Sequence, residues 1–260
     1  MAIKLFYYSA TGNTRLASQY LQKRISGVKL FDISSADKRE VTGEEIIGLA
    51  TPVFYFKPPV IVSNFIDSLQ ADKVKIFMLV TYGMMPGRTT WILKNKIERK
   101  GYDLLGCHLL RMPESYPPFI AKGWTDCNAP RDNEITAFNS FITFLGGIMG
   151  QKKPVFENIK LPGRTDFLNK IIPVPSRKRI MKKFGEINVN TQRCNFCAVC
   201  VKACVYNAIR MDGLPKIDKE QCQACFSCIN NCPLGALSTT NYSLTTTYFG
   251  PSESLKEKLL

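Results

Sequence analysis

Residues 2–25 read AIKLFYYSATGNTRLASQYLQKRI, and this stretch decides how the first half of the chain folds. Residues 2–8 are a short apolar run of strand-forming residue types, which predicts a β-strand. From Leu16 to Ile25 the apolar residues recur at spacings of three and four, which predicts an amphipathic helix. A strand that leads directly into a helix is typical of an α/β unit with a parallel sheet.

The same alternation of strand and helix continues to about residue 150. It predicts a doubly wound α/β fold, with a five-stranded parallel sheet and helices on both faces. Ligands of such sheets bind beyond the carboxyl ends of the strands. The other strands are predicted at residues 28–33, 46–50, 74–80 and 104–110, and the other helices at residues 61–69, 89–100 and 133–145.

The loop between the first strand and the first helix has the chemistry of a phosphate site. Ser9, Thr11 and Thr14 supply hydroxyl groups, and Gly12 allows a tight turn. The amino end of the following helix adds free N–H groups and a positive dipole end. An ordinary helix-capping turn is the alternative for so short a motif. The chain has neither a Walker-type lysine loop nor a dinucleotide glycine motif, which disfavours nucleoside triphosphates and dinucleotides.

This loop resembles that of flavodoxins, whose first loop follows the pattern T/S-x-T-G-x-T and wraps the phosphate of FMN. Residues 9–14, SATGNT, match the pattern throughout. The resemblance implies two more flavin-contacting loops, after the third and fourth strands, where aromatic rings can stack on the flavin and glycine lets the backbone approach it. The FMN contacts expected on this basis are Ser9, Thr11, Gly12, Asn13, Thr14, Pro52, Val53, Phe54, Tyr55, Thr81, Tyr82 and Gly83.

Some of these assignments have plain structural alternatives. Tyr55 and Phe56 could instead pack in the hydrophobic core. Glu114 and Tyr116, in the loop after the fifth strand, could border the flavin edge, although a surface loop is the favoured interpretation.

Eight of the ten cysteines form two runs with the same spacing, C-x2-C-x2-C-x3-C, repeated after 28 residues. A zinc site would need four ligands per ion, typically from two CxxC pairs. The double run instead resembles bacterial two-cluster ferredoxins, over residues 186–240. The resemblance implies two [4Fe–4S] clusters with crossed ligation, in which the fourth cysteine of each run binds the other cluster. The expected sets are Cys194, Cys197, Cys200 and Cys232 for one cluster, and Cys222, Cys225, Cys228 and Cys204 for the other. Val205 stands where that family usually has proline after the fourth cysteine.

These patterns divide the chain into an FMN-binding domain (1–150), a basic proline-containing linker (151–185), a small α+β ferredoxin-like domain (186–240) and a carboxyl-terminal tail (241–260). The chain has 35 basic and 21 acidic residues, a formal charge of +14. Residues 151–186 hold 10 basic and 3 acidic residues, half of that excess. We therefore expect acidic redox partner proteins to dock near this joint. Nucleic acid is not expected, because the joint lacks interleaved aromatic residues and any known binding motif.

Several other chemistries are disfavoured by what the chain contains. His108 is the only histidine, which excludes two-histidine zinc fingers and His-ligated haem. Cys107 and Cys127 lack ligand spacing and are interpreted as buried or spare thiols. The amino terminus shows no secretory signal, and no apolar run approaches about 20 residues, so a cytoplasmic protein without a membrane-spanning helix is expected.

As a whole, the chain resembles the flavodoxin–ferredoxin fusion proteins of anaerobic bacteria and archaea. The resemblance implies an intracellular electron carrier that passes single electrons between two [4Fe–4S] clusters and FMN. The alternative is a flavin-dependent reductase of a small substrate, fed with electrons through the clusters. An open cavity over the flavin favours the reductase, and a flavin edge covered by Tyr82 or Tyr55 favours the carrier.

Overall fold

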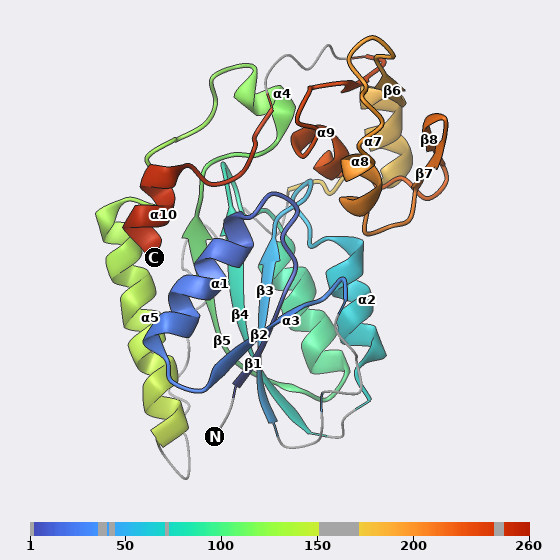
Figure 1. The fold of residues 1–260 in the computed structure, drawn as a ribbon. Helices are drawn as coiled ribbons and strands as arrows, with labels where there is room; N and C mark the ends of the chain where they lie inside the picture. Colours follow the sequence, from blue (N-terminus) through green and yellow to red (C-terminus); the bar gives the residue numbers. More distant parts are fainter. Residues whose placement is uncertain (1–2, 36–40, 42–44, 71–72, 151–171, 242–246) are drawn as a thin grey trace.

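The computed structural model describes residues 3–35, 41, 45–70, 73–150, 172–241 and 247–260. Five parallel strands form one sheet in the order β2-β1-β3-β4-β5, which is the flavodoxin-like order and confirms the predicted fold class. The predicted strands and helices are all present (Figure 1). The strands are β1 (Ile3–Tyr7), β2 (Val28–Asp32), β3 (Glu45–Pro52), β4 (Val74–Tyr82) and β5 (Asp103–Arg111), and the helices are α1 (Asn13–Arg24), α2 (Val60–Ser68), α3 (Thr89–Arg99), α4 (Pro117–Ile120) and α5 (Asp132–Gly150).

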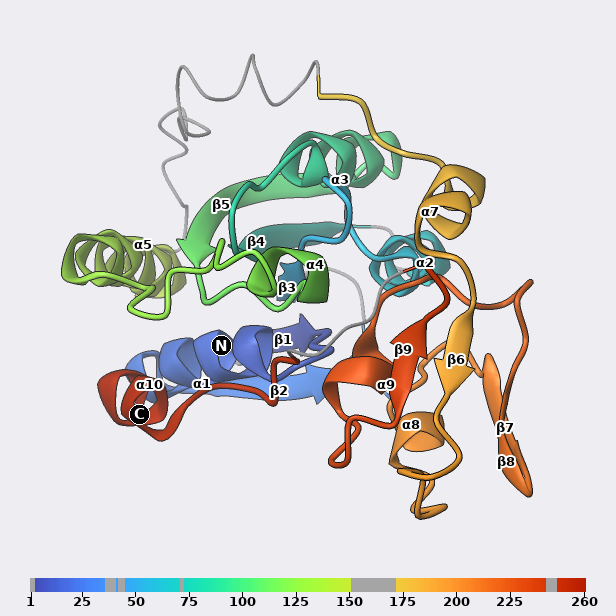
Figure 2. The same cartoon turned by 90° about the horizontal axis from the view of Figure 1, so that it is seen from above.

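Helices cover both faces of the sheet, because the strands are apolar on both sides. In β1, Leu5 and Tyr7 pack in the same apolar cluster as residues of α1 and α5. Phe6 lies on the other face, in the cluster that contains Phe65 of α2 and residues of α3. Figure 2 shows these two helical layers from above.

The carboxyl-terminal cysteine-rich domain lies over the carboxyl ends of the parallel strands (Figures 1 and 2). The 28-residue repeat of the sequence is present in its structure, since α8 and α9 begin 28 residues apart and so do β7 and β9. Its elements are α7 (Arg177–Phe184), β6 (Ile187–Val189), α8 (Val199–Lys202), β7 (Ile209–Asp212), β8 (Leu214–Ile217), α9 (Ser227–Asn230) and β9 (Leu237–Thr239).

Helix α7 belongs to this domain and carries part of the basic joint. It begins after Ser176, whose side chain caps the helix by accepting from the N–H of Arg179. Ile180 and Phe184 are buried in the apolar cluster of the cysteine-rich domain. Residues 151–171 of the predicted linker lie outside the described residues.

The carboxyl-terminal segment returns to the first domain. Helix α10 (Glu253–Leu259) packs against α1, and its Leu255 and Leu259 are buried in the same cluster as Leu5. Within the described ranges, no helix has the length and apolar character needed to cross a membrane.

The apolar side chains near the cysteines differ in burial. Ile209, Phe226, Ile229 and Leu237 are buried, whereas Phe196 is 56% exposed. Its backbone has a φ of 59°, in the left-handed region.

Candidate functional site

The phosphate loop predicted from the sequence lies at the point where the strand order of the sheet reverses. The chain leaves β1 toward β2 on one side and returns to β3 on the other, which is the switch point where α/β sheets bind ligands. Gly12 has a φ of 96° and precedes α1, whose first turn contains no acidic residue. The positive end of the helix dipole is therefore available to an anion.

Hydrogen bonds of the predicted contact residues hold this loop in place. The hydroxyls of Thr14 and Thr81 are 2.8 Å apart and join α1 to β4. Asn13 donates its amide N–H to the carbonyl oxygen of Pro113 at 2.9 Å, and the Gly12 N–H donates to the Ser9 hydroxyl at 3.1 Å. These hydrogen bonds connect the loop to β4 and to the loop after β5.

A cavity at the carboxyl ends of the strands gathers the predicted flavin contacts, all except Gly12 and Tyr55. Sequence reasoning missed Ala10 and Cys225, and it favoured a surface position for the loop after β5, which lines the cavity as well. That loop ends a neighbouring parallel strand, so it meets the others at the same edge of the sheet. The lining residues are Ser9, Ala10, Thr11, Asn13, Thr14, Pro52, Val53, Phe54, Thr81, Tyr82, Gly83, Met112, Pro113, Glu114, Ser115, Tyr116 and Cys225.

Glu114 is the acidic residue of this cavity. Burial raises its pKa, although its carboxylate accepts hydrogen bonds from the backbone N–H groups of Tyr116, Met84 and Ser115. The bond from Met84 ties the loop after β5 to the loop after β4. Gly83 is needed there, because a Cβ at this position would lie 2.3 Å from a Glu114 carboxylate oxygen and 2.9 Å from its Cα.

A second, larger cavity of about 510 Å³ adjoins the first and shares Val53, Gly83, Glu114 and Tyr116 with it. Apolar side chains line most of it, and Arg179 and Lys183 of α7 stand at its edge. Tyr55 lies here rather than in the first cavity.

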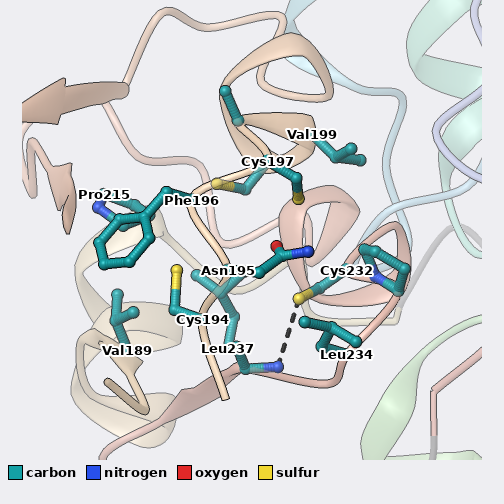
Figure 3. A pocket seen from close by; sticks show the side chains of 14 residues that line it. Val189, Cys194, Asn195, Phe196, Cys197, Val199, Pro215, Cys232, Leu234 and Leu237 are labelled. Carbon is teal, nitrogen blue, oxygen red and sulfur yellow. Dashed lines mark hydrogen bonds between the residues drawn. The ribbon is translucent and has the colours of Figure 1, made fainter. Parts of the chain in front are cut away.

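Cys194, Cys197, Cys200 and Cys232 line one small cavity in the cysteine-rich domain (Figure 3). They are the four residues that crossed ligation assigns to one cluster. The sulfur of Cys232 accepts a hydrogen bond from the N–H of Ala236 at 3.2 Å, drawn as the dashed line. Across the described residues, no three His, Cys, Asp or Glu side chains are close enough to hold a single metal ion. A cubane does not need three ligands on one ion, since each cysteine binds a different iron.

The other four cysteines also lie close together, on the side facing the first domain. Burial, together with the neighbouring Cys222 and Cys204 thiolates, raises the pKa of Cys225 to about 12, although hydrogen bonds from backbone N–H groups act against the shift. Burial likewise raises the pKa of Cys228 well above its usual value, again with Cys225, Cys222 and Cys204 as neighbours. Thiols so hard to ionise suit a site where bound metal supplies the compensating positive charge.

The backbone around both cysteine sets is shaped for an anionic group. Phe196 and Ala198 in the first run and Ala224 and Phe226 in the second all have left-handed backbone angles. Left-handed residues turn consecutive N–H groups to one side, which produces the anion-binding concavities common at iron–sulfur sites. The donor set and the backbone therefore both fit [4Fe–4S] clusters.

The second cysteine run is bonded directly to the flavin-side loops. Tyr55 donates its hydroxyl to the carbonyl oxygen of Ala224 at 2.6 Å. Asn230 donates to the Ser115 carbonyl oxygen at 2.8 Å, and Asn231 donates to that of Ala10 at 3.0 Å. The rings of Tyr55, Tyr116, Phe184 and Phe226 pack together across the same boundary.

His108 takes no part in either site. It stacks between Phe138 and Phe141 at centroid distances of 5.0 and 5.4 Å, whereas Cys107 packs on the opposite face of the sheet. Burial lowers its pKa to about 4. A Cys-His catalytic pair is therefore absent at this position, as the strand alternation predicts.

Comparison with known proteins agrees with the division of the chain into a flavodoxin-like domain and a cysteine-rich domain. Residues 178–236 match the family model of the 4Fe–4S dicluster domain. The chain is 33% identical over 60 residues to a ferredoxin of Pyrobaculum islandicum, covering 22% of this chain and 56% of the relative. It is 35% identical over 77 residues to an uncharacterised ferredoxin of Methanocaldococcus jannaschii, covering 29% of this chain and 50% of the relative. The chain thus spans about half the length of these curated relatives.

Among solved structures, a flavodoxin from the domain Archaea aligns with 58% of this chain and 100% of its own, at 15% identity and a TM-score of 0.44. The flavodoxin-like assignment of the first domain itself follows from the strand order of the sheet. The chain therefore joins a flavodoxin-like α/β sheet to a carboxyl-terminal 4Fe–4S ferredoxin-type domain.

Proposed function

We propose that this protein is an electron carrier that passes single electrons between two [4Fe–4S] clusters and FMN. The supporting observation is the position of Cys225, which lines the same cavity as the phosphate loop. A cluster bound by Cys204, Cys222, Cys225 and Cys228 would adjoin the flavin, and a cluster bound by the other set would lie farther from it. The clusters and the flavin supply the redox chemistry, and the chain positions them.

Cofactor content is the first test. Anaerobic purification should give one FMN and about eight irons per chain, from two four-iron clusters. Fewer than about four irons, with zinc present, would reject the proposal.

Cysteine variants test the order of the cofactors. Cys204→Ser should damage the flavin-side cluster and slow flavin reduction by a low-potential donor. Cys232→Ser is the matched variant in the other set, and should damage the outer cluster instead. Electron paramagnetic resonance of each variant identifies the cluster that is lost. Damage to the set of Cys194 in the Cys204 variant would contradict crossed ligation.

The exposed basic side of α7 is our candidate docking surface for an acidic redox partner. Lys178 and Lys182 are exposed on this helix, next to the boundary between the domains. We expect association with an acidic carrier protein to weaken as salt concentration rises, because surface charges are screened.

The 510 Å³ cavity favours a second candidate function, reduction of a small substrate at the flavin. Its volume lies in the range of small-molecule sites. Lys183 at its edge favours an anion with an apolar body. Benzoate, followed by flavin absorbance, should bind the holoprotein more tightly than benzamide does. Lys183→Gln should weaken benzoate about fivefold, or about 1 kcal/mol, whereas Lys182→Gln serves as the matched control. Equal binding of both probes would remove this candidate.

A further inference from the structure

Two tyrosine hydroxyls buried at the boundary between the domains donate to no acceptor among the described residues, although the oxygen of one of them, Tyr206, accepts from the backbone N–H of Ile61. One belongs to Tyr8, which follows β1 and is 2% exposed, and the other to Tyr206, two residues after Cys204. A buried hydroxyl whose proton has no acceptor is energetically unfavourable. Such a pair at one place therefore points to a bound group that accepts hydrogen bonds.

Both hydroxyls lie near the flavin-side cysteines. The Cys225 and Cys204 thiolates are among the groups that raise the pKa of each tyrosine, after the larger effect of burial. Packing also brings Tyr8 and Tyr206 close together, since Val205, the neighbour of Tyr206, lies against the apolar cluster that contains Tyr8. The two hydroxyls thus reach one cysteine set from two domains.

Toward a cluster, both tyrosine hydroxyls can act only as hydrogen-bond donors. A phenol hydroxyl carries its proton at neutral pH, so both tyrosines can act as donors. Cluster and thiolate sulfurs are acceptors, and hydrogen bonds to them are one determinant of the reduction potential. The residues that line the other cysteine set include no tyrosine.

We propose that Tyr8 and Tyr206 donate hydrogen bonds to sulfur atoms of the cluster held by Cys204, Cys222, Cys225 and Cys228, and raise its reduction potential. This inference rests on the proposed ligation of that cluster. The donor hydrogen bonds stabilise the extra negative charge of the reduced cluster. Since Tyr8 belongs to the flavodoxin-like domain, the potential also depends on the docking of the two domains.

The test is a redox titration of the purified holoprotein, followed by electron paramagnetic resonance, in wild type, Tyr8→Phe and Tyr206→Phe. Each variant should lower the midpoint potential of one cluster and leave the other unchanged. We expect at least a threefold change in the one-electron reduction equilibrium, which corresponds to about 28 mV at 59 mV per tenfold. Tyr7→Phe is the matched control, because its side chain packs on the opposite face of the same strand.

Cluster content separates this inference from the proposed function. Iron and resonance measurements on the wild type decide whether two clusters are present at all. With both clusters present, unchanged potentials in both tyrosine variants would overturn the inference, as would an equal shift of both clusters or a shift in Tyr7→Phe. If one variant loses iron, the other decides alone. If both lose iron, deuterium exchange of the wild type decides, since spectra without an exchangeable hydroxyl deuteron coupled to the cluster would overturn the inference.

Discussion

The two cysteine runs repeat their backbone angles as well as their residues. Left-handed φ values occur at Phe196, Ala198 and Asn207, and again 28 residues later at Ala224, Phe226 and Gly235. A left-handed conformation costs a residue other than glycine about 1–2 kcal/mol. Five of these six positions bear that cost, which a bound anionic cluster can offset through the N–H groups turned toward it.

Gly83 allows the loops after β4 and β5 to come close together at the flavin cavity, because it has no side chain. Gly83→Ala should weaken FMN binding at least tenfold, because the new Cβ would overlap the Glu114 carboxylate and lie 2.9 Å from its Cα. Fluorescence titration of the apoprotein with FMN measures the effect. Gly147→Ala is the control, since its Cβ would meet nothing within 4 Å. Equal FMN affinity in the two variants would contradict the role given to Gly83.

His108 makes the stability of the first domain depend on pH. Its pKa is lowered to about 4 in the folded chain, whereas an unfolded histidine titrates near 6.5. The stability that its neutral form provides is therefore complete above about pH 6.5 and is lost as the pH falls toward 4.

His108→Phe keeps an aromatic ring between Phe138 and Phe141 and removes a buried Nε2 that has no partner among the described residues. Between pH 7.5 and 5 the variant should gain about 1–2 kcal/mol over the wild type. Urea unfolding of both holoproteins at each pH measures this gain, and the acid sensitivity of the clusters cancels in the comparison. A difference that does not change with pH would refute it.

At this scale, the sequence predicted residue types better than residue roles. The resemblance of the cysteine runs to two-cluster ferredoxins implied which four thiols line the cavity of Figure 3, although one of them comes from the other run. Asn13 and Thr14 were predicted as FMN contacts, but their hydrogen bonds to Pro113 and Thr81 come from residues at least 67 positions away. Such partners cannot be read from local spacing.

Among the elements, α10 is the one whose role sequence patterns could not give. Its seven residues, ESLKEKL, contain two leucines and five polar side chains, and this is too short a pattern to identify what they pack against. The strands of the sheet were predicted to within two residues at each end, because they are long, apolar and separated by periodic helices.

Helix α10 should contribute to the stability of the first domain. Leu259 is 1% exposed in the core cluster, so Leu259→Ala should lower the free energy of unfolding by about 2–5 kcal/mol. Leu260→Ala is the matched control, because the neighbouring side chain is 48% exposed. Urea unfolding monitored by flavin fluorescence distinguishes the two. A change below about 0.5 kcal/mol in both would show that α10 adds nothing to the core.

At the scale of the molecule, the two domains meet through one aromatic cluster and a few hydrogen bonds. Tyr55 takes part in both, through its ring contacts with Tyr116 and Phe184 and its bond to Ala224. The sequence interpretation placed Tyr55 at the flavin or in the core. The boundary could not be predicted because its partners lie about 170 residues apart in the chain, and local patterns do not encode such pairing.

Tyr55→Ala should therefore loosen the boundary between the domains. We expect faster amide hydrogen exchange in residues 222–231, because the variant loses both the ring contacts and one hydrogen bond. Tyr55→Phe keeps the ring, and should lose only about 1 kcal/mol of local protection. Tyr102→Phe, far from the boundary, is the control. Unchanged exchange in Tyr55→Ala would show that the remaining contacts suffice.

The return of α10 to α1 has a consequence for biosynthesis. Roughly 100 residues separate α5 from α10, and at about 5–20 residues per second their translation takes about 5–20 s. During that time the first domain lacks the two leucines that complete its core, and its phosphate loop lacks Tyr248, whose hydroxyl donates to the side-chain oxygen of Asn13. The ribosome makes the cysteine-rich segment before α10, so the sheet lacks its complete core while that segment is synthesised. The flavin site therefore reaches its final form only after both sets of cluster ligands have left the ribosome.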